Sequence, residues 1–272
     1  MRVASVNVNG IRAAVGRGMR DWLEDRRPDV VGLQEMRCPA DQVPELDGYH
    51  VSHHLGDIPG RNGVAVLSRT APTAVRLGTG SREFDREGRY IEVDLDLGEG
   101  RPDLTVGSLY LPKGGTPYED EASRSKYERK MRFCRHFRSY LTRARRGAQR
   151  AGREFLVIGD WNVAPTELDL RNWRTNRRSE GFLPEERAWI ASIQSPRTLI
   201  DVVRMLHPDT NGPYSWWSWR GQSFANDTGW RIDHQLASPA LAAAAVVGGT
   251  DREPTYEARK SDHSPVVVDY DL

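Results

Sequence analysis

Polar side chains recur in this sequence at the points where short apolar segments end. These positions are held by carboxylate, amide, phenol and imidazole groups: Asn7, Glu35, Tyr110, Asp160, Asn162, Asp233, Asp262 and His263. Side chains at strand ends sit on a rigid platform and can converge on one cleft. Oxygen-rich sets of this kind suit a hard cation such as Mg²⁺ or Mn²⁺ rather than zinc. Such a cation, together with Asp, Asn and His, is what phosphodiester hydrolysis requires.

Each of these positions also has a simpler interpretation. Asp and Asn at a strand end are most often turn formers. Glu35 could end a strand in solvent, and Asp262-His263 could be a local cap. The prediction of a catalytic site therefore depends on the joint occurrence of complementary groups.

The segments that would position these groups have the patterns of β-strands. Residues 91–97 alternate apolar and acidic side chains, which is the period of a half-buried strand. Residues 30–33 and 155–158 are continuous apolar runs, which suit central strands covered on both faces. Further strands are expected at 3–8, 63–67, 105–111, 232–236 and 265–268.

Helical patterns are fewer. Residues 19–25 form a short one that ends near Pro28, and another begins at Pro184 with acids in its first turn. The longest begins near Glu119, and within residues 121–153 apolar residues recur at spacings of three and four: Tyr127, Met131, Cys134, Phe137, Leu141, Ala144 and Ala148. The rest of that segment holds twelve Lys or Arg and two acids, which we interpret as a solvated charged surface.

Strands dominate the pattern, helices are interspersed, and no linker rich in Pro, Gly or Ser divides the chain. Residues 75–88 and 211–229 are expected to be long surface loops. We therefore expect one domain over residues 1–272, of the α/β (α+β) class, with two packed sheets flanked by helices.

The composition is that of an ordinary globular protein, with 38% hydrophobic residues and a formal net charge of +1. Net charge alone therefore says nothing about nucleic acid. Cys38 and Cys134 could form one bridge, but two free thiols in a reducing compartment is the better interpretation. We find no signal-peptide pattern and no apolar run near the ~20 residues of a membrane helix. We expect a cytoplasmic monomer.

The segments that contain the polar groups resemble the exonuclease III and AP endonuclease family, within the broader endonuclease/exonuclease/phosphatase group, over nearly the whole chain. The resemblance rests on Asn7-Val8-Asn9-Gly10-Ile11-Arg12, Leu33-Gln34-Glu35, Asn62-Gly63-Val64-Ala65-Val66-Leu67-Ser68, Tyr110-Leu111-Pro112, Gly159-Asp160-Trp161-Asn162, Gly229-Trp230-Arg231-Ile232-Asp233 and Ser261-Asp262-His263. A further segment, from Glu167 to Arg187, resembles the DNA-repair branch specifically. The resemblance implies a four-layered sandwich of two packed, mainly antiparallel β-sheets flanked by helices.

The resemblance also implies a magnesium site, in which manganese is an alternative. The residues at or near the metal would be Asn7, Glu35, Asp160, Asn162, Asp262 and His263. Glu35 would be the principal ligand. Whether one or two metals act is left open.

The catalytic roles follow from the same resemblance. Asp160 would orient or deprotonate the attacking water, and Asn162 would hydrogen-bond the scissile phosphate. Tyr110 would contact that phosphate or stabilise charge in the transition state. His263, oriented by Asp233, would bind the phosphate or transfer a proton.

The expected partner is double-stranded DNA with an abasic site or a blocked or recessed 3′ end. Contacts to its backbone are expected from Lys113, Arg171, Asn172, Arg174, Asn176, Arg177 and Arg178, for which a solvated charged surface is the alternative. Family aromatics matching Trp216 and Trp230, with Ile232 beside them, would wall a small apolar pocket for the flipped abasic sugar. Lys113 and His234 depart from the family's usual residues and are expected to alter the balance of endonuclease and exonuclease action.

Two other functions fit parts of the pattern. A phosphodiesterase or phosphatase of the same group that acts on RNA or small phosphoesters would share the metal residues. The 169–187 segment and the Trp216/Trp230 pair argue against it. A non-catalytic DNA-binding protein of the same fold would not need every catalytic position to be filled.

Overall fold

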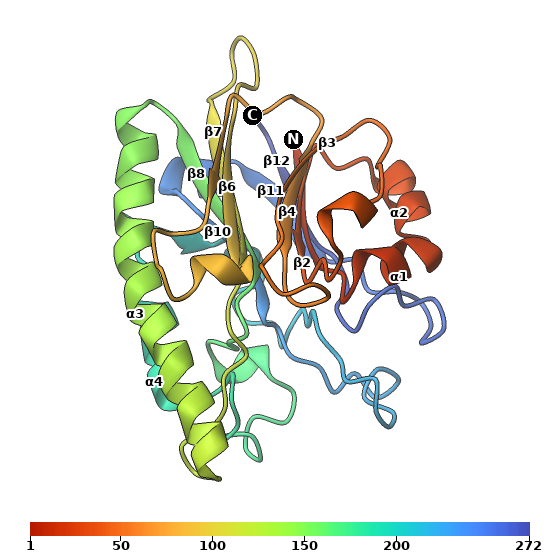
Figure 1. Cartoon of the computed structure of the whole chain (residues 1–272), viewed down its shortest axis with the longest axis vertical. Helices are drawn as coiled ribbons and strands as arrows, with labels where there is room; N and C mark the ends of the chain where they lie inside the picture. The colour runs from red at the N-terminus through yellow and green to blue at the C-terminus, as the bar shows by residue number, and fades with distance from the viewer.

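The computed structural model describes residues 1–272 and consists of two six-stranded β-sheets (Figure 1). The first sheet has the order β11 (Ala245–Thr250), β12 (Val266–Tyr270), β1 (Arg2–Asn7), β2 (Val30–Gln34), β4 (Val64–Ser68), β3 (His50–His54). The second has the order β5 (Ala74–Leu77), β6 (Tyr90–Leu95), β7 (Leu104–Tyr110), β8 (Glu154–Asp160), β10 (Asp233–Ala237), β9 (Ile200–Asp201).

Each sheet contains a single parallel pair at its centre. These pairs are β1 with β2 and β7 with β8, and every other neighbouring pair is antiparallel. The prediction of mainly antiparallel sheets is therefore confirmed. The continuous apolar runs at 30–33 and 155–158 lie in β2 and β8, which are central and fully buried apart from one end residue, as their patterns indicated.

The sheets pack face to face and helices cover their outer sides. The core between the sheets joins residues of both, such as Val66, Val106, Leu156 and Val268. Helices α1 (Ile11–Gly16) and α2 (Met19–Arg26) pack on the first sheet, and α3 (Glu121–Arg150) and α4 (Pro184–Ser192) pack on the second (Figure 1). The short helices α5 (Val202–Leu206) and α6 (Pro239–Ala243) both pack against β9 at the edge of the second sheet. The four-layered sandwich is confirmed.

Helix α3 buries most of the predicted apolar stripe. It begins where Asp120 accepts a hydrogen bond from the backbone N–H of Ser123 at 2.7 Å. Cys134, Phe137, Leu141 and Ala148 are buried as expected, whereas Tyr127, Met131 and Ala144 are only half-buried. The first turns of α3 extend beyond the sheet that the rest of the helix covers (Figure 1).

The edges of the sheets were predicted less well. The expected loop at 75–88 is wrong for residues 75–77, because β5 occupies them and pairs with β6 alone. Val75 and Leu77 are exposed there, so the segment lacks the buried pattern of a strand. The edge strands β3 and β11 were not predicted for the same reason. The expected loop at 211–229 contains neither a helix nor a strand and is confirmed.

Cys38 and Cys134 are both free and buried, so the free-thiol interpretation is confirmed. None of the helices combines the length and apolar character that a membrane span requires.

Candidate active site

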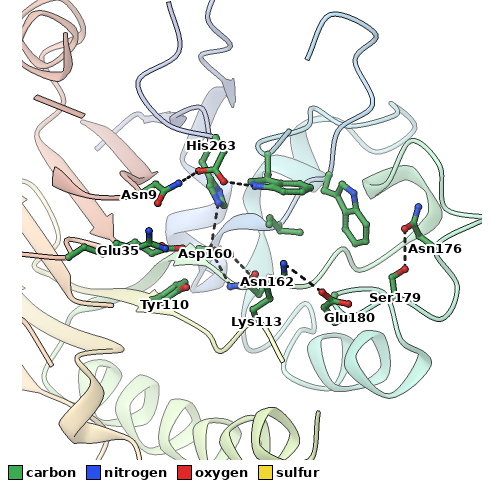
Figure 2. A pocket seen from close by; sticks show the side chains of 16 residues that line it. Asn9, Glu35, Tyr110, Lys113, Asp160, Asn162, Asn176, Ser179, Glu180 and His263 are labelled. Atoms are coloured by element: carbon green, nitrogen blue, oxygen red, sulfur yellow. Dashed lines mark hydrogen bonds and ion pairs between the residues drawn. The ribbon is translucent and has the colours of Figure 1, made fainter. Parts of the chain in front are cut away.

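The predicted catalytic residues meet at one edge of the sandwich (Figure 2). Asn7 at the end of β1 lies in register with Gln34 of β2, and Tyr110 at the end of β7 lies in register with Asp160 of β8. Strands of a parallel pair present their carboxyl ends at the same edge, where α/β sheets commonly bind ligands. The two parallel pairs also contact each other across the sandwich, so their end residues converge.

Asn7 is buried beneath this site and holds two carboxylates in position by hydrogen bonds. Its side-chain amide donates hydrogen bonds to Glu35 Oε1 and Asp160 Oδ2, both at 2.9 Å. Its own Oδ1 accepts from the backbone N–H of Asn9 at 3.0 Å. A single fully buried amide of the first sheet therefore holds a carboxylate of each sheet in place.

Asp160 is also held by Asn162, which adopts a left-handed backbone conformation with φ 48°. The Asn162 backbone N–H donates to Asp160 Oδ1 at 2.9 Å, and its side-chain amide donates to Asp160 Oδ2 at 3.2 Å and to the Leu111 carbonyl at 2.8 Å. Both hydrogens of the Asn162 side-chain amide are thus already donated. The amide can donate to a phosphate only if one of these two hydrogen bonds breaks. Burial raises the pKa of Asp160 to about 7, against the opposing effect of His263.

His263 lies between two carboxylates. Its Nδ1 is 2.8 Å from Asp233 Oδ2, which also accepts a hydrogen bond from Ser215 Oγ at 2.6 Å. Its Nε2 lies 3.9 Å from Asp160 Oδ2. Burial lowers the pKa of His263, but the charge and hydrogen bond of Asp233 outweigh it and raise the pKa to about 10. The imidazole is therefore a cation at neutral pH.

Asp262 connects the polar cluster to the aromatic side of the site. Its Oδ1 accepts from Asn9 Nδ2 at 2.8 Å, and its Oδ2 accepts from Trp216 Nε1 at 3.1 Å. Burial alone would raise the pKa of Asp262, but the His263 charge and these two hydrogen bonds hold it below its ordinary value. Asp262 is therefore ionised and fixes the Trp216 ring.

A cavity of about 390 Å³ joins these groups to an apolar wall. Trp216 and Trp230 meet edge to face, with ring centroids 6.3 Å apart and planes at 81°. Their backbones pair with each other, and Trp216 also forms a bridge with His263. Ile232 lies beside them, and all three side chains line the same cavity as Tyr110 and Lys113. The predicted association of Trp216, Trp230 and Ile232 therefore exists in the structure.

Tyr110 lines the cavity on the side of Glu35. Burial, reinforced by the charges of Glu35 and Asp160, raises its pKa well above the ordinary value. The phenol is therefore protonated and can donate a hydrogen bond. The Arg89 guanidinium lies over the Tyr110 ring, 5.1 Å from its centroid, and steadies it.

The donor atoms fit a hard cation. Glu35 Oε2 and Asp233 Oδ1 are buried and accept no hydrogen bond, although the Arg37 guanidinium lies against Glu35 Oε2. Ligand atoms of Asp160, Asp233 and His263 all lie within 4.8 Å of one another. A protonated His263 between two carboxylates accounts for that cluster without a metal. The carboxylate oxygens of Glu35 and Asp160 remain the groups with the chemistry that Mg²⁺ prefers.

The predicted DNA-binding residues divide into two sets. Lys113 and Asn176 line the cavity, whereas Arg171, Asn172, Arg174, Arg177 and Arg178 do not. The Arg174 and Arg177 guanidiniums lie over the Trp173 ring, at 4.5 and 4.7 Å from its centroid. These arginines form a surface beside the cavity rather than part of its lining.

Sequence reasoning missed several residues of the site. The cavity is also lined by Asn9, Arg37, Ser179, Glu180 and Gly181. Asn9 and Arg37 adjoin the Asn7 and Glu35 segments, and this proximity was the one available signal. Glu180 forms an ion pair with Lys113 at 3.6 Å, which no local pattern indicates. Ser215, which holds Asp233, lies in the loop where only the aromatics were singled out.

A fully buried ion pair lies beneath the cavity. Lys130 Nζ of α3 contacts Glu186 Oε1 of α4 at 2.6 Å and donates to the carbonyls of Asn162 at 2.8 Å and Lys113 at 3.0 Å. Glu186 Oε2 in turn accepts from the backbone N–H of Gly181 at 2.7 Å. One lysine–glutamate pair therefore connects three segments that line the cavity.

A two-sheet sandwich with buried carboxylates, an imidazolium and an oxygen-rich cavity at one edge defines a phosphoester hydrolase. The chain belongs to the endonuclease/exonuclease/phosphatase family, whose sequence profile matches residues 4–263. The predicted family, and with it the class of hydrolytic nuclease, is confirmed.

Curated relatives place the chain in the exonuclease III and AP endonuclease branch. It is 33% identical to an exodeoxyribonuclease III of Haemophilus influenzae, with 99% of this chain and 100% of that protein covered. It is 32% identical to the DNA repair nuclease APEX1 of Danio rerio, with 98% of this chain and 81% of that protein covered. The resemblance to a DNA-repair phosphodiesterase is therefore confirmed over the full length.

Solved structures agree with this placement. An AP endonuclease from Archaeoglobus fulgidus matches with a TM-score of 0.84 and 28% identity, with both chains fully covered. A 3′ phosphatase from Neisseria bound to a product DNA hairpin matches with a TM-score of 0.85 and 26% identity, also with full coverage. The roles of individual residues in this chain stay predictions.

Proposed function

We propose that this protein is a Mg²⁺-dependent DNA-repair phosphodiesterase that hydrolyses DNA on the 5′ side of abasic sites and also trims 3′ ends. The observation that supports this best is the single cavity in which Glu35, Asp160 and His263 face a wall of two tryptophans. The polar half suits a scissile phosphate and the apolar half suits a sugar without a base. Because both sheets supply residues, we propose that residues 1–272 act as one catalytic domain.

A divalent cation, Mg²⁺ or Mn²⁺ in its place, would be held by Glu35 with Asp160 and Asp262 nearby. The hard carboxylate oxygens of Glu35 support this assignment: Oε2 is buried, accepts no hydrogen bond and is paired only with the Arg37 guanidinium, which a bound cation would displace. When bound, the cation supplies charge that stabilises the phosphate and the leaving oxygen. Asn7 keeps Glu35 and Asp160 apart and correctly oriented, and His263, as a cation, is assigned to the phosphate rather than to the metal.

The residues then have separate tasks in the reaction. Asp160, with a pKa of about 7, accepts a proton from the attacking water. His263 Nε2–H and the Tyr110 hydroxyl donate hydrogen bonds to phosphate oxygens as charge develops on them. Water adds to phosphorus and the bond to the 3′ oxygen breaks. The released 3′ oxygen takes up a proton from solvent and Asp160 returns its proton to solvent, which leaves a 3′-hydroxyl and a 5′-deoxyribose phosphate.

The tryptophan wall accounts for lesion selection. Trp216, Trp230 and Ile232 are packed together, and Asp262 fixes Trp216 by a hydrogen bond. A nucleotide without a base is extruded more easily than a paired one, and a sugar pocket too narrow for a base would exclude an intact nucleotide. Lys113 and Asn176, which line the cavity, would contact the DNA backbone together with the arginines near Trp173.

A parallel assay on three duplexes tests the function. The duplexes contain an abasic site, a recessed 3′ end or a 3′-phosphate, and each is incubated with Mg²⁺ and with EDTA. We expect cleavage of all three with Mg²⁺ and none with EDTA. Activity confined to RNA or small phosphoesters in the same assay would contradict the proposal and favour another branch of the family.

A further inference from the structure

The charge of this protein is concentrated in one segment. Residues 121–153 contain twelve of its 39 Lys and Arg but two of its 38 Asp and Glu, so they contribute +10. All other residues together contribute −9, and the near-zero total conceals this separation. A surface that only confers solubility normally mixes both signs.

From Arg135 onward the cations of α3 form no ion pair, and the same is true of Arg124 and Lys126 in its first turns. In its first half, Arg129 and Arg132 pair with Glu83, and Lys130 pairs with Glu186. Further along the helix none of the arginines forms an ion pair: these are Arg135, Arg138, Arg143, Arg145, Arg146 and Arg150. No Asp or Glu occurs between 129 and 153. Like charges three and four residues apart repel on a helix, so this arrangement costs stability when no anion is present.

These arginines form one outward-facing row. Arg135, Arg138, Arg143, Arg146 and Arg150 are all exposed, and we call them the α3 arginine row. Arg135 and Arg138 line a shallow depression with Ser139 and Thr142, whose hydroxyls donate to the Arg135 and Arg138 carbonyls. At about 1.5 Å per residue the row extends over roughly 22 Å. Figure 1 shows α3 along the outside of the second sheet.

The row is separate from the catalytic cleft. Lys130, which contacts the carbonyls of Asn162 and Lys113, lies on the buried side of α3, opposite the row. DNA that fills the cleft therefore approaches a different face of the molecule. Double-helical DNA presents one negative charge per ~1.7 Å of its axis, and arginine binds phosphate in a planar, two-pronged manner.

We propose that the α3 arginine row is a second docking surface, which binds the phosphate backbone of duplex DNA outside the cleft. The choice of DNA as the polyanion rests on the proposed function. Backbone contacts of this kind are independent of sequence and hold the enzyme on a long duplex between encounters with a lesion. A second DNA duplex, or a distant part of the same DNA molecule, would bind the α3 arginine row while another part of the DNA lies in the cleft.

A charge-removal variant tests this surface against a matched control. The test variant is Arg135→Gln/Arg138→Gln/Arg146→Gln. The control is Arg20→Gln/Arg101→Gln/Arg197→Gln, which removes the same charge from exposed arginines that form no ion pair. Fluorescence anisotropy measures the Kd of each protein for a long undamaged duplex over a range of salt concentrations. Cleavage of a short abasic duplex, long enough only to fill the cleft, is measured in parallel.

The expected result is a selective loss of long-duplex binding. The slope of log K against log salt should become shallower by about 0.9 for each phosphate contact removed, and Kd at low salt should rise roughly tenfold. The control should keep the parental slope, and both variants should cleave the short duplex at the parental rate. These binding measurements need no activity, so a failure of the proposed function would be seen separately as the absence of abasic cleavage.

Three outcomes would overturn the docking surface. Equal slopes in the test and control variants would show that the row contacts no phosphate. A parallel loss of short-duplex cleavage would place the row within the footprint of the cleft. Tighter binding of an RNA duplex than of DNA, lost in the test variant alone, would show that the occupant is wrongly assigned.

Discussion

Asp160 illustrates how this site prepares a single carboxylate. Its Oδ2 accepts from Asn7 and Asn162, and its Oδ1 accepts from the Asn162 backbone. These bonds fix its direction while burial raises its pKa to about 7. A general base whose pKa lies near the working pH is deprotonated in much of the protein and is still basic enough to accept a proton.

Replacement of this carboxylate tests its assigned role. We expect Asp160→Asn to lower kcat on an abasic duplex by roughly 10²–10⁴-fold, because the amide cannot accept the water's proton. Binding of the same duplex should be largely unchanged, since the volume and the Asn7 contact are retained. Single-turnover cleavage and anisotropy separate the two effects, and a variant that cuts at the parental rate would refute the assignment.

The charge state of His263 gives a second prediction at this scale. The raised pKa of about 10 depends on Asp233, while burial acts in the opposite direction. In Asp233→Asn the imidazole pKa should therefore fall well below the parental value, while the charges of Asp160 and Asp262 still oppose the effect of burial. Titration of the His263 ring by NMR measures this directly. Ser215→Ala keeps the Asp233 charge and should retain a raised pKa, and equal titrations in both variants would contradict the account.

Helices α3 and α4 do more than cover the second sheet. Through Lys130 and Glu186 they connect the backbones at 113, 162 and 181, all of which line the cavity. Both side chains are completely buried, so each charge depends on its partner. A buried pair of this kind adds little net stability but is costly to break.

Lys130→Met tests this connection. The change should lower the free energy of unfolding by about 3–5 kcal/mol, because Glu186 is left as an uncompensated buried charge. Lys130→Met/Glu186→Gln should recover much of that stability in urea unfolding. Its kcat/KM should nevertheless stay below the parental value, because the Asn162 and Lys113 carbonyls lose their donor. Full recovery of both quantities would show that the pair has no positioning role.

At the scale of the whole molecule, a buried network of charged side chains joins the segment that contains Asp169 to Asp201 in β9, the edge strand of the second sheet. The fully buried Arg231 donates to Asp169 Oδ1 at 2.6 Å and to Asp201 Oδ2 at 2.8 Å, and Arg204 also contacts Asp169. Although burial acts to raise them, the pKa values of Asp169 and Asp201 are lowered by Arg231. Stability from these carboxylates is present above their unfolded pKa, about 3.9, and is lost as the pH falls below it.

Urea unfolding between pH 3 and 7 tests this network. The parental protein should lose stability steeply below about pH 4, as the two aspartates take up protons on unfolding. Arg231→Met should be less stable at pH 7 by about 3–5 kcal/mol. Its acid-range slope should be shallower, because the pKa values are no longer lowered. An unchanged slope would show that other carboxylates govern acid unfolding.

Much of the sandwich and of the catalytic cluster was predictable because buried strands are continuous apolar runs that end in polar residues. Asn7, Glu35 and Asp160 stand at such ends and were found in this way. Ser215 and Glu180 were not, since their partners Asp233 and Lys113 are distant in sequence and no periodicity relates them. The edge strands β3, β5 and β11 were not predicted either. A strand with one neighbour buries too few of its side chains to show the apolar pattern of a buried strand.

The bridges of Trp216 have a kinetic consequence. One strip of backbone pairs Trp216 with Trp230 on one side and with His263 on the other, so the wall of the sugar pocket and the imidazolium cannot shift independently. A nucleotide that fits the wall badly would also tilt the group that meets the phosphate. We therefore expect such an enzyme to distinguish substrates by the rate of the chemical step more than by the rate of binding. A poor substrate would bind but dissociate before it is cut.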